Sequence, residues 1–393
     1  MTPPVIAFGG QRLTRVSLVI AAVGLVAAVI GAFVDVQKLL FSYLAAWLTA
    51  VYLAVGALVL LLTIHAMRAG WPTAVRRLLE SMVATLPVLA VLFLPILAGL
   101  GLLYPWVHPD RIADEHARHI VEHRAPYLNP GFFVVRAVIY FAIWIAIAVV
   151  LRRWSFAQDE GARPDLKHKM YVASGFLLPV VAITLVFSSF DWVMSLEPTW
   201  YSTMFPIYVF ASGFVGAIGL LTAVTYAAER SGTLAGLHES HYYALGRLLL
   251  AFTIFWAYAA FFQFMLIWIA DKPEEVAFFL DRWEGPFRAA SILLVMARFV
   301  VPFVLLMPYR IKRRPRPLTW MALWIVASTY IDFHWLSAPL LRRRALPYNL
   351  LDLAAIALVG GVAVAFGAWR LRGRAVVPVH DPRLEEAFAY RSV

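Results

Sequence analysis

Long runs of apolar residues alternate with short polar segments along most of the 393-residue chain. Several runs are about twenty residues long, which is the length that a helix needs to cross the hydrocarbon core of a bilayer. Inside a bilayer each run must be helical, because every backbone N–H and C=O group needs a partner within its own segment. The pattern predicts an all-α polytopic membrane protein with about ten transmembrane helices. We place these helices at residues 14–34, 40–66, 79–104, 131–151, 170–192, 203–228, 244–270, 287–308, 318–335 and 350–370.

The composition supports this class and limits the chemistry. Hydrophobic residues make up 62% of the chain and charged residues 15%, whereas soluble domains contain about 45–50% and about 25%. The chain has no cysteine, which excludes disulfides, thiolate-bound zinc and cysteine-ligated iron–sulfur clusters. A haem held by histidines is disfavoured, because His65 and His334 lie near opposite faces of the predicted membrane domain. We expect no catalytic residue, metal or redox cofactor on this chain.

The formal net charge of +11 lies in short loops beside apolar runs, which indicates membrane orientation rather than nucleic-acid binding. Basic residues gather in the loops on the side of both termini. The other side holds loop 105–130, with mixed charges, and the acidic loop 271–286; the arginines at 342–344 are an exception on that side. By the positive-inside rule, both termini and the tail 371–393 lie in the cytoplasm, and residues 1–370 form the integral membrane domain.

Loop 105–130 carries His116, His119 and His123 at helical spacing, with acids and bases between them. These histidines could bind a metal, but interleaved charges are more typical of a solvated surface. We therefore predict an exposed short helix at this place.

The segment 188–205 lies between two apolar runs, where one predicted helix ends and the next begins. It carries two acids, Asp191 and Glu197, among aromatic residues of the kind that favour the membrane–water interface. One interpretation is a simple interfacial turn, and the other is a site or a dock for a partner. In the second interpretation the partner-facing outer surface consists of Trp192, Glu197, Trp200 and Tyr201.

Ionisable residues within the predicted spans cost several kcal/mol unless they are paired or hydrated, so each is a functional candidate. An inner group near the cytoplasmic ends includes His65 and Glu80. An outer group consists of Arg136, Asp191, Asp332, His334 and Asp352. Such groups suit either a hydrated proton path or a set of structural salt bridges, and both hypotheses stay open.

Arg298 lies near the middle of its predicted span and stays charged at all accessible pH values. It needs a partner or water, and Asp332 or Asp191 is the natural candidate. We therefore interpret Arg298 as a fixed counter-charge between the inner and outer groups. The candidate proton path comprises His65, Glu80, Asp191, Arg298, Asp332 and His334.

Two long segments carry a resemblance to a known family. Residues 41–97 read FSYLAAWLTAVYLAVGALVLLLTIHAMRAGWPTAVRRLLESMVATLPVLAVLFLPIL, and residues 188–210 read SSFDWVMSLEPTWYSTMFPIYVF. Both resemble the F subunit of bacterial alternative complex III, a quinol:electron-acceptor oxidoreductase, within the NrfD/PsrC-like integral membrane superfamily. The resemblance implies two four-helix bundles, formed by spans two to five and six to nine, with flanking helices one and ten.

The resemblance also implies partners and a division of labour. In this family a related C subunit is assigned the quinol site, an extrinsic iron–sulfur subunit lies on the outer face, and haem c subunits pass electrons onward, often to a terminal oxidase. The F subunit is assigned structural and proton-conducting roles. His65, Glu80, Asp191 and Glu197 lie in the matching segments, whereas Arg298, Asp332 and His334 are proposed from depth alone.

The sequence thus predicts a lipid-embedded subunit of a quinol:cytochrome c oxidoreductase in the bacterial inner membrane, with its redox centres and quinone on partner subunits. Three alternatives stay open. The chain could bind quinol itself, it could be a purely structural scaffold, or it could act alone as a transporter.

Overall fold

The computed structural model describes residues 6–161, 163–285, 287–337 and 348–392. Regular structure in this part of the chain is helical, apart from one isolated antiparallel bridge between Ala7 and Ala375. Eight of the described helical segments are long and apolar enough to cross a membrane, which confirms an all-α polytopic membrane protein. The principal helices are α1 (Gln11–Ala66), α7 (Pro130–Ala157), α8 (Pro164–Trp192), α9 (Phe205–Arg230), α10 (Glu239–Ala270), α15 (Pro315–Ser337) and α16 (Leu350–Leu371).

Helix α1 contains the first two predicted spans in one continuous element of 56 residues. At 1.5 Å per residue it would be about 84 Å long if straight, roughly twice the thickness of a bilayer. It breaks instead at Asp35, where φ is −158° and ψ is 91°. The Asp35 carboxylate accepts a hydrogen bond from the backbone N–H of Lys38 at 2.9 Å, so it caps the second arm. We call residues 11–34 the first arm and residues 36–66 the second arm.

The third predicted span, 79–104, is not one regular helix. Turns divide it into short pieces, and two of these begin with a proline in their first turn, Pro87 and Pro95. Proline lacks a backbone N–H and cannot continue the hydrogen-bond ladder. The pieces are α2 (Arg76–Val83), α3 (Leu86–Val91), α4 (Leu94–Ala98) and α5 (Leu100–Leu103).

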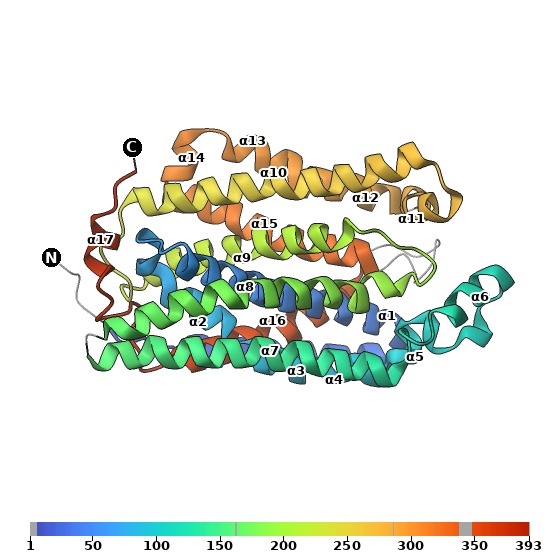
Figure 1. Cartoon of the computed structure of the whole chain (residues 1–393), viewed down its shortest axis with the longest axis horizontal. Coiled ribbons are helices and arrows are strands. Elements are labelled where there is room, and N and C mark those ends of the chain that lie inside the picture. Colours follow the sequence, from blue (N-terminus) through green and yellow to red (C-terminus); the bar gives the residue numbers. More distant parts are fainter. Residues whose placement is uncertain (1–5, 162, 286, 338–347, 393) are drawn as a thin grey trace.

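Two sets of helices pack around the second arm of α1. The first bundle joins this arm to α2–α5, α7 and α8. The second bundle contains α9, α10, α15 and one interrupted helix. That interrupted helix consists of α12 (Phe287–Val295), the π-helical turn η6 (Met296–Val300) and α13 (Val301–Leu306). The first arm of α1 runs beside α16 (Figure 1), so the packing agrees with two bundles and two flanking helices.

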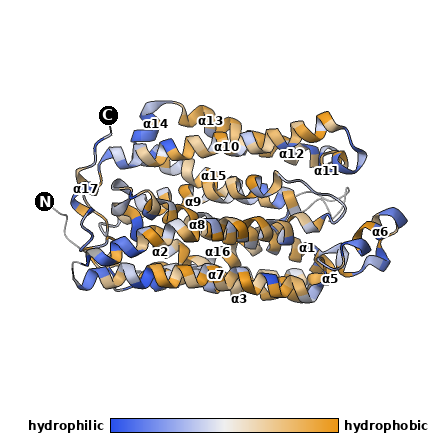
Figure 2. Cartoon of the chain, in the orientation of Figure 1, coloured by the Kyte–Doolittle hydropathy of each residue, from blue (hydrophilic) through white to orange (hydrophobic). Residues whose placement is uncertain are grey.

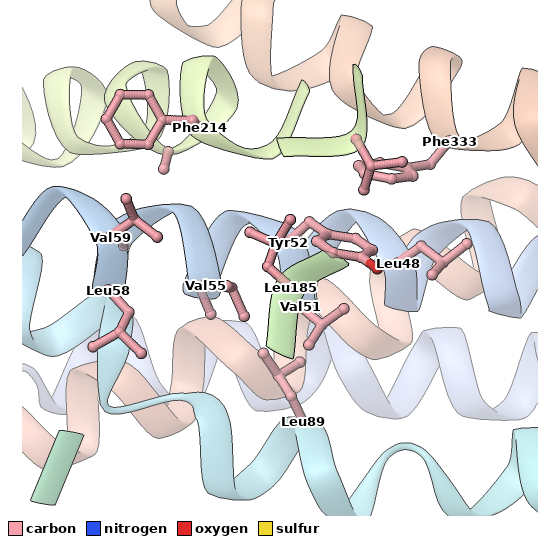
Figure 3. Packing of buried hydrophobic residues seen from close by; sticks show 14 of the residues in the cluster. Leu48, Val51, Tyr52, Val55, Leu58, Val59, Leu89, Leu185, Phe214 and Phe333 are labelled. Atoms are coloured by element: carbon pink, nitrogen blue, oxygen red, sulfur yellow. The ribbon is translucent and has the colours of Figure 1, made fainter. Parts of the chain in front are cut away.

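Small residues allow the helices to approach closely. A side-chain carbon on Gly56 of the second arm would lie 2.8 Å from the carbonyl oxygen of Gly213 in α9. Such contacts replace the hydrophobic driving force that is missing between helices in lipid. Around this contact the second arm buries apolar side chains on all its faces, including Val51, Val55 and Leu58 (Figure 3).

Polar residues concentrate at the two ends of the helices, and apolar residues cover their middle (Figure 2). Both described chain ends lie at one end, which we call the termini end. The loop that carries α6 (Glu115–His123) lies at the opposite end, which we call the loop end (Figure 1). Helix α6 is the exposed short helix predicted for the histidine-rich loop, and Asp114 caps it. The arginines at 342–344 fall outside the described residues.

The C-terminal tail is docked onto the helices at the termini end. Val376 and Leu384 are buried, and α17 (Leu384–Ala389) packs against the 3-10 helix η1 (Trp71–Val75). The backbone carbonyl of Ala387 lies 2.8 Å from Nε2 of His241 in α10. The tail therefore connects elements of both bundles at the termini end.

Candidate functional site

A buried Arg–Asp pair lies near the loop end of the first bundle. Asp191, in the last turn of α8, accepts hydrogen bonds from Nε and Nη2 of Arg136 at 2.8 Å each and from the Tyr140 hydroxyl at 2.7 Å. Arg136 also donates to the carbonyl of Tyr127 at 2.9 Å and stacks over the ring of Phe132. The two planar groups meet in the bidentate geometry that gives the strongest pairs. This pair forms a closed salt bridge.

Trp192 and Trp200 do not form an outer surface, so that part of the partner-facing prediction is wrong. Trp192 is 0% exposed and packs among the rings of Trp47, Phe141 and Trp144. Trp200 is 3% exposed and stacks on a phenylalanine of α11 (Pro273–Trp283) at 4.1 Å. Aromatic rings favour both a membrane interface and a protein core, and here Trp192 and Trp200 lie in the core.

The other two residues of that predicted surface differ from each other. Tyr201 is 52% exposed and can contact a partner. Glu197 forms an ion pair with Arg282 of α11 at 2.6 Å. Arg282 is buried and also donates to the carbonyls of Phe278 and Leu336, so it joins α11 both to Glu197 and to the end of α15.

A second buried Arg–Asp pair lies inside the second bundle. Arg298 is 2% exposed and Asp332 is 0% exposed, with 3.7 Å between Nε of Arg298 and Oδ2 of Asp332. Asp332 accepts hydrogen bonds from the Tyr208 hydroxyl, from Ser212 at 2.6 Å and from the Trp256 indole at 2.9 Å. Asp332 was one of the two partners predicted for Arg298, and the structure places these two residues together.

The guanidinium of Arg298 is held mainly by uncharged oxygens. Nη1 donates to Thr329 at 2.6 Å and to the carbonyl of Ile325 at 2.9 Å, and Nη2 donates to the carbonyl of Ser212 at 2.7 Å. Its Nε has no hydrogen-bond partner among the described residues. Arg298 lies on the π-helical turn η6, a type of irregularity that often marks functional sites.

His334 belongs to a third cluster, with Asp352 rather than with Asp332. Nε2 of His334 lies 3.4 Å from Oδ1 of Asp352, and the Tyr330 hydroxyl donates to the same oxygen at 2.8 Å. The other oxygen of Asp352 accepts the backbone N–H of Asn349 at 2.7 Å, so this aspartate also caps α16. Nδ1 of His334 is buried without a partner among the described residues.

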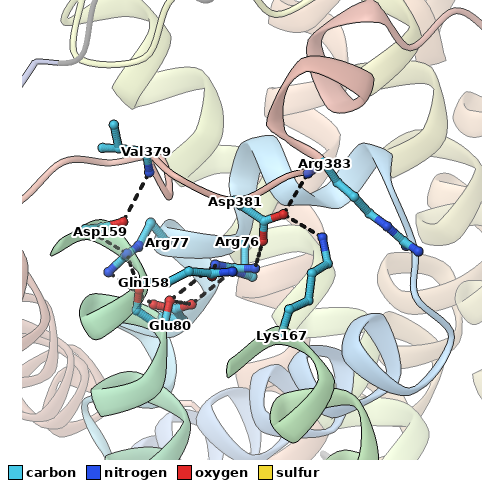
Figure 4. A network of polar contacts seen from close by, with 10 residues as sticks. Arg76, Arg77, Glu80, Gln158, Asp159, Lys167, Val379, Asp381 and Arg383 are labelled. Carbon is cyan, nitrogen blue, oxygen red and sulfur yellow. Dashed lines mark hydrogen bonds and ion pairs between the residues drawn. The ribbon is translucent and has the colours of Figure 1, made fainter. Parts of the chain in front are cut away.

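Glu80 anchors a fourth cluster at the termini end (Figure 4). Its carboxylate lies 3.2 Å from Nε of Arg76 and 3.7 Å from Nη1 of Arg77, and it accepts a hydrogen bond from Ser155 at 2.6 Å. Arg77 also forms an ion pair with Asp159 at 2.5 Å. Both arginines are buried. Their spacing of four and three residues from Glu80 could have indicated these ion pairs.

The same cluster extends to the tail through Asp381, which the sequence did not single out. Asp381 pairs with Arg76 at 2.5 Å and with Lys167 at 2.6 Å. Burial raises the pKa of Asp381, but the two cations outweigh it and hold the pKa below its usual range. His65 lies beside this group and lines a pocket of about 320 Å³ that opens at the termini end.

The six residues of the candidate proton path therefore occupy four clusters. Arg298 and Asp332 lie together, whereas Asp191, His334 and Glu80 each belong to another cluster. No hydrogen bond among the described residues joins the Glu80 cluster to the Arg298 pair. Tyr52 contacts both bundles: it bonds Ser188 at 3.3 Å and stacks on Phe333 at 5.2 Å. Water molecules would have to complete a path.

An apolar cavity of about 710 Å³ lies between the bundles and the flanking helices. It is lined by both arms of α1, by α2, α9, α15 and α16, and Tyr330 is one of its few polar residues. Pockets of this size and polarity are typical of sites for hydrophobic small molecules. Among the described residues, no group of three or more histidines and carboxylates could hold a metal ion.

No family model matches this sequence, and no curated protein matches it. The function is therefore inferred from the resemblance at residues 41–97 and 188–210 and from the four clusters and the cavity.

Proposed function

We propose that this chain is an integral membrane subunit of a quinol:cytochrome c oxidoreductase similar to bacterial alternative complex III, with a structural and a proton-transfer role. The two segments that resemble the F subunit support the family. Because the sequence has no cysteine, the iron–sulfur clusters of such a complex would lie on another subunit; by the resemblance this is an extrinsic one, and haem c subunits and a related membrane subunit would complete the electron path. Basic loops at the termini end support a bacterial inner-membrane orientation with both termini in the cytoplasm.

The observation that carries the proton role is the Arg298–Asp332 pair. A charge held in the membrane interior costs about 2.5–3.5 kcal/mol on insertion scales, so such a pair persists where it has a use or strong compensation. Asp332 is surrounded by two hydroxyl groups, from Tyr208 and Ser212, that can pass a proton to and from its carboxylate. Arg298 supplies a fixed positive charge that opposes passive proton leak, as in water channels.

The test is the Asp332→Asn variant of the purified complex in sealed vesicles. We expect assembly and quinol oxidation to persist, while the number of protons released per electron falls, because the amide cannot exchange a proton with these hydroxyls. Glu80→Gln should have the same effect from the inner side. The exposed Glu239, which pairs with Arg313 at the termini end, provides the control variant Glu239→Gln. An unchanged proton yield in both test variants would favour the structural scaffold.

Carboxylates in two of the clusters already have full sets of partners, which favours the purely structural scaffold as a second candidate. Asp191 has three side-chain donors, and Glu80 is held by two arginines and a serine. Carboxylates paired in this way fix the helices relative to one another without any transport. On this hypothesis, the conservative variants change the melting temperature of the complex and leave proton release unchanged.

The apolar cavity favours a third candidate, in which this chain binds a quinol itself. Tyr330 lines the cavity and donates to Asp352, which contacts His334, so a proton acceptor lies beside an apolar slot. Gly360 also lines the cavity, and a side chain there would meet nothing within 4 Å. Gly360→Phe should therefore fill the cavity. The matched control is Gly175→Phe in α8, which also meets nothing within 4 Å.

Photolabelling with a reactive quinone analogue distinguishes these candidates. We expect the label on the related membrane subunit, in wild type and in both glycine variants. Label on this chain that disappears in Gly360→Phe and persists in Gly175→Phe would instead establish a quinol site here.

A further inference from the structure

A pocket at the termini end is surrounded by positively charged groups. It has a volume of about 320 Å³ and lies between the end of the second arm of α1, the start of α8 and the tail. One carboxylate, that of Asp381, also lines it. The cations of its lining are Arg68, Arg76, Lys167 and Arg383, and His65 and His168 also line it.

The charges in this pocket do not cancel. Asp381 is already bound by Arg76 at 2.5 Å and by Lys167 at 2.6 Å, and it accepts the backbone N–H of Arg383 at 2.9 Å. The side chains of Arg68 and Arg383 form no ion pair among the described residues. Two guanidinium groups thus remain for an anion, and guanidinium geometry matches phosphate oxygens well.

Arg68 adds an independent observation, because its backbone is in the left-handed region with φ of 51°. It ends α1 in a Schellman motif, with Arg68 N–H bonded to the His65 carbonyl and Ala69 N–H bonded to the Ile64 carbonyl. Glycine is the usual residue at this position, since it adopts positive φ without strain. The guanidinium of Arg68 is stacked over Tyr171 at 3.8 Å. An arginine held in a conformation that favours glycine indicates a use for its side chain.

The pocket also adjoins a lipid-facing surface. Val172, Phe176 and Ile183 follow His168 along the same face of α8. All three are exposed. Phe176 is 76% exposed. A molecule with a phosphate head and acyl chains can place the head in the pocket and the chains along these residues. A free phosphate ester shares the head chemistry but gains nothing from the apolar face.

We propose that this pocket binds a phosphate group, and that its source is the headgroup of an anionic phospholipid in the leaflet at the termini end. Arg68 and Arg383 contact the phosphate oxygens, and Lys167 and Arg76 complete the cationic lining. The bound headgroup bridges α1, α8 and the tail, so it stabilises the docked tail. Basic pockets between transmembrane helices on the cytoplasmic side are a known class of lipid site.

The experiment uses the full chain, with its co-purified subunits, and native mass spectrometry during titration with phosphatidylglycerol or phosphatidylcholine. The test variant is Arg68→Gln with Arg383→Gln, which removes two cations that have no ion pair to lose. The control is Arg314→Gln with Arg372→Gln, two exposed arginines of the same end that do not line the pocket. Each cation contributes about fivefold, so the test variant should bind phosphatidylglycerol about 30-fold more weakly. The control should lose less than about threefold, because distant exposed charges are screened.

A second arm distinguishes the source of the phosphate. Inorganic phosphate is added to the protein in nanodiscs of phosphatidylcholine alone, and the melting temperature is compared with that in equimolar phosphatidylcholine and phosphatidylglycerol. Stabilisation by phosphatidylglycerol alone supports the lipid headgroup. Equal stabilisation by inorganic phosphate, lost in the test variant, assigns the pocket to a soluble phosphate ester and overturns the lipid source. If wild type prefers neither phosphatidylglycerol nor phosphate, or if test and control variants lose binding equally, the pocket is not a phosphate site.

Discussion

Arg136–Asp191 in the first bundle and Arg298–Asp332 in the second are both buried arginine–aspartate pairs, but their geometry differs. In the first bundle, Arg136 donates two hydrogen bonds of 2.8 Å to Asp191. In the second bundle, Nε of Arg298 lies 3.7 Å from Asp332, beyond hydrogen-bond distance. Asp332 is instead held by three uncharged donors. The same two residue types thus form a closed bridge in one bundle and a looser ion pair in the other.

The backbone explains the difference. Arg136 lies in the regular helix α7, one turn from Tyr140, which also binds Asp191. Arg298 lies on a π-helical turn and is turned toward carbonyl and hydroxyl oxygens of α9 and α15. A bidentate guanidinium holds a carboxylate ionised, whereas hydroxyl groups can donate or accept protons. On the proposed function, the first pair is structural and the second takes part in proton exchange.

The largest expected effect comes from removing the guanidinium of each pair. Arg136→Gln should cost about 3–5 kcal/mol of stability, because it leaves a buried carboxylate without its counter-charge. Arg298→Gln should cost about 1.5–3 kcal/mol, because Asp332 keeps its three donors. Unfolding of the purified protein in detergent, followed by tryptophan fluorescence, measures both.

Arg153→Gln is the control on the same helix as Arg136, since Arg153 is exposed and should cost less than about 0.5 kcal/mol. Equal losses for Arg136→Gln and Arg298→Gln would contradict the distinction between a closed and a looser pair.

The tyrosine of each pair gives the next test. Tyr140→Phe and Tyr208→Phe each remove a hydrogen bond to a charged acceptor, which is worth about 1.5–3 kcal/mol. We expect the larger loss for Tyr208→Phe, because Asp332 accepts no hydrogen bond from a guanidinium. Tyr43→Phe is the control, since Tyr43 donates to a neutral carbonyl at 2.7 Å and should cost about 0.5–1.5 kcal/mol. If Tyr140→Phe costs more, the bridge of the first bundle depends on its hydroxyl rather than on its guanidinium.

Asp381 adds to the comparison a carboxylate that lies outside the spans, where water can protonate it. Its pKa is lower in the folded protein than in the unfolded chain. Its contribution is therefore fully present above the unfolded value of about 3.9 and is lost as the pH falls through the folded value. Asp381→Asn should release the tail at neutral pH at a cost of about 1.5 kcal/mol.

Limited proteolysis of residues 372–392 measures this release. Wild type should resist at neutral pH and become sensitive only in acid, whereas Asp381→Asn is sensitive throughout. Asp165→Asn is the control, because that residue forms only exposed ion pairs. A tail that stays protected in Asp381→Asn would show that its apolar contacts suffice.

Hydrophobic runs located the helices because twenty apolar residues leave few alternatives to a membrane helix. The break predicted between the first two spans, 14–34 and 40–66, is present in the structure at Asp35. In the structure Asp35 caps the second arm and the helix resumes at once. Local sequence contains the capping residue, but it does not show that the first arm packs against α16.

The sequence identified the buried charged residues of the spans more accurately than it identified their partners. Asp332 was one of two candidates for Arg298, and the choice required the rotation of two helices relative to each other. The same limit explains Trp192, whose ring suits an interface or a core equally. The docking of Asp381 could not be predicted at all, because 305 residues separate it from Arg76.

The smallest expected effect concerns a third arginine–acid pair, which extends the comparison toward the surface. Glu197 pairs with Arg282 at 2.6 Å, and its side chain is 18% exposed. Arg282 keeps three backbone carbonyl acceptors and the ring of Phe278 at 3.5 Å when Glu197 is replaced. Glu197→Gln should therefore cost only about 0.5–1 kcal/mol.

Salt separates this pair from the two buried pairs. Because Glu197 is partly hydrated, the cost of Glu197→Gln should fall as the salt concentration rises, while the costs of Arg136→Gln and Arg298→Gln stay constant. Glu275→Gln is the control, since its partner Lys272 is well exposed and the pair lies 3.6 Å apart; its cost should be close to zero at any salt concentration. A cost for Glu197→Gln that does not respond to salt would place this pair with the closed bridge of Asp191, as a fixed support of the loop end.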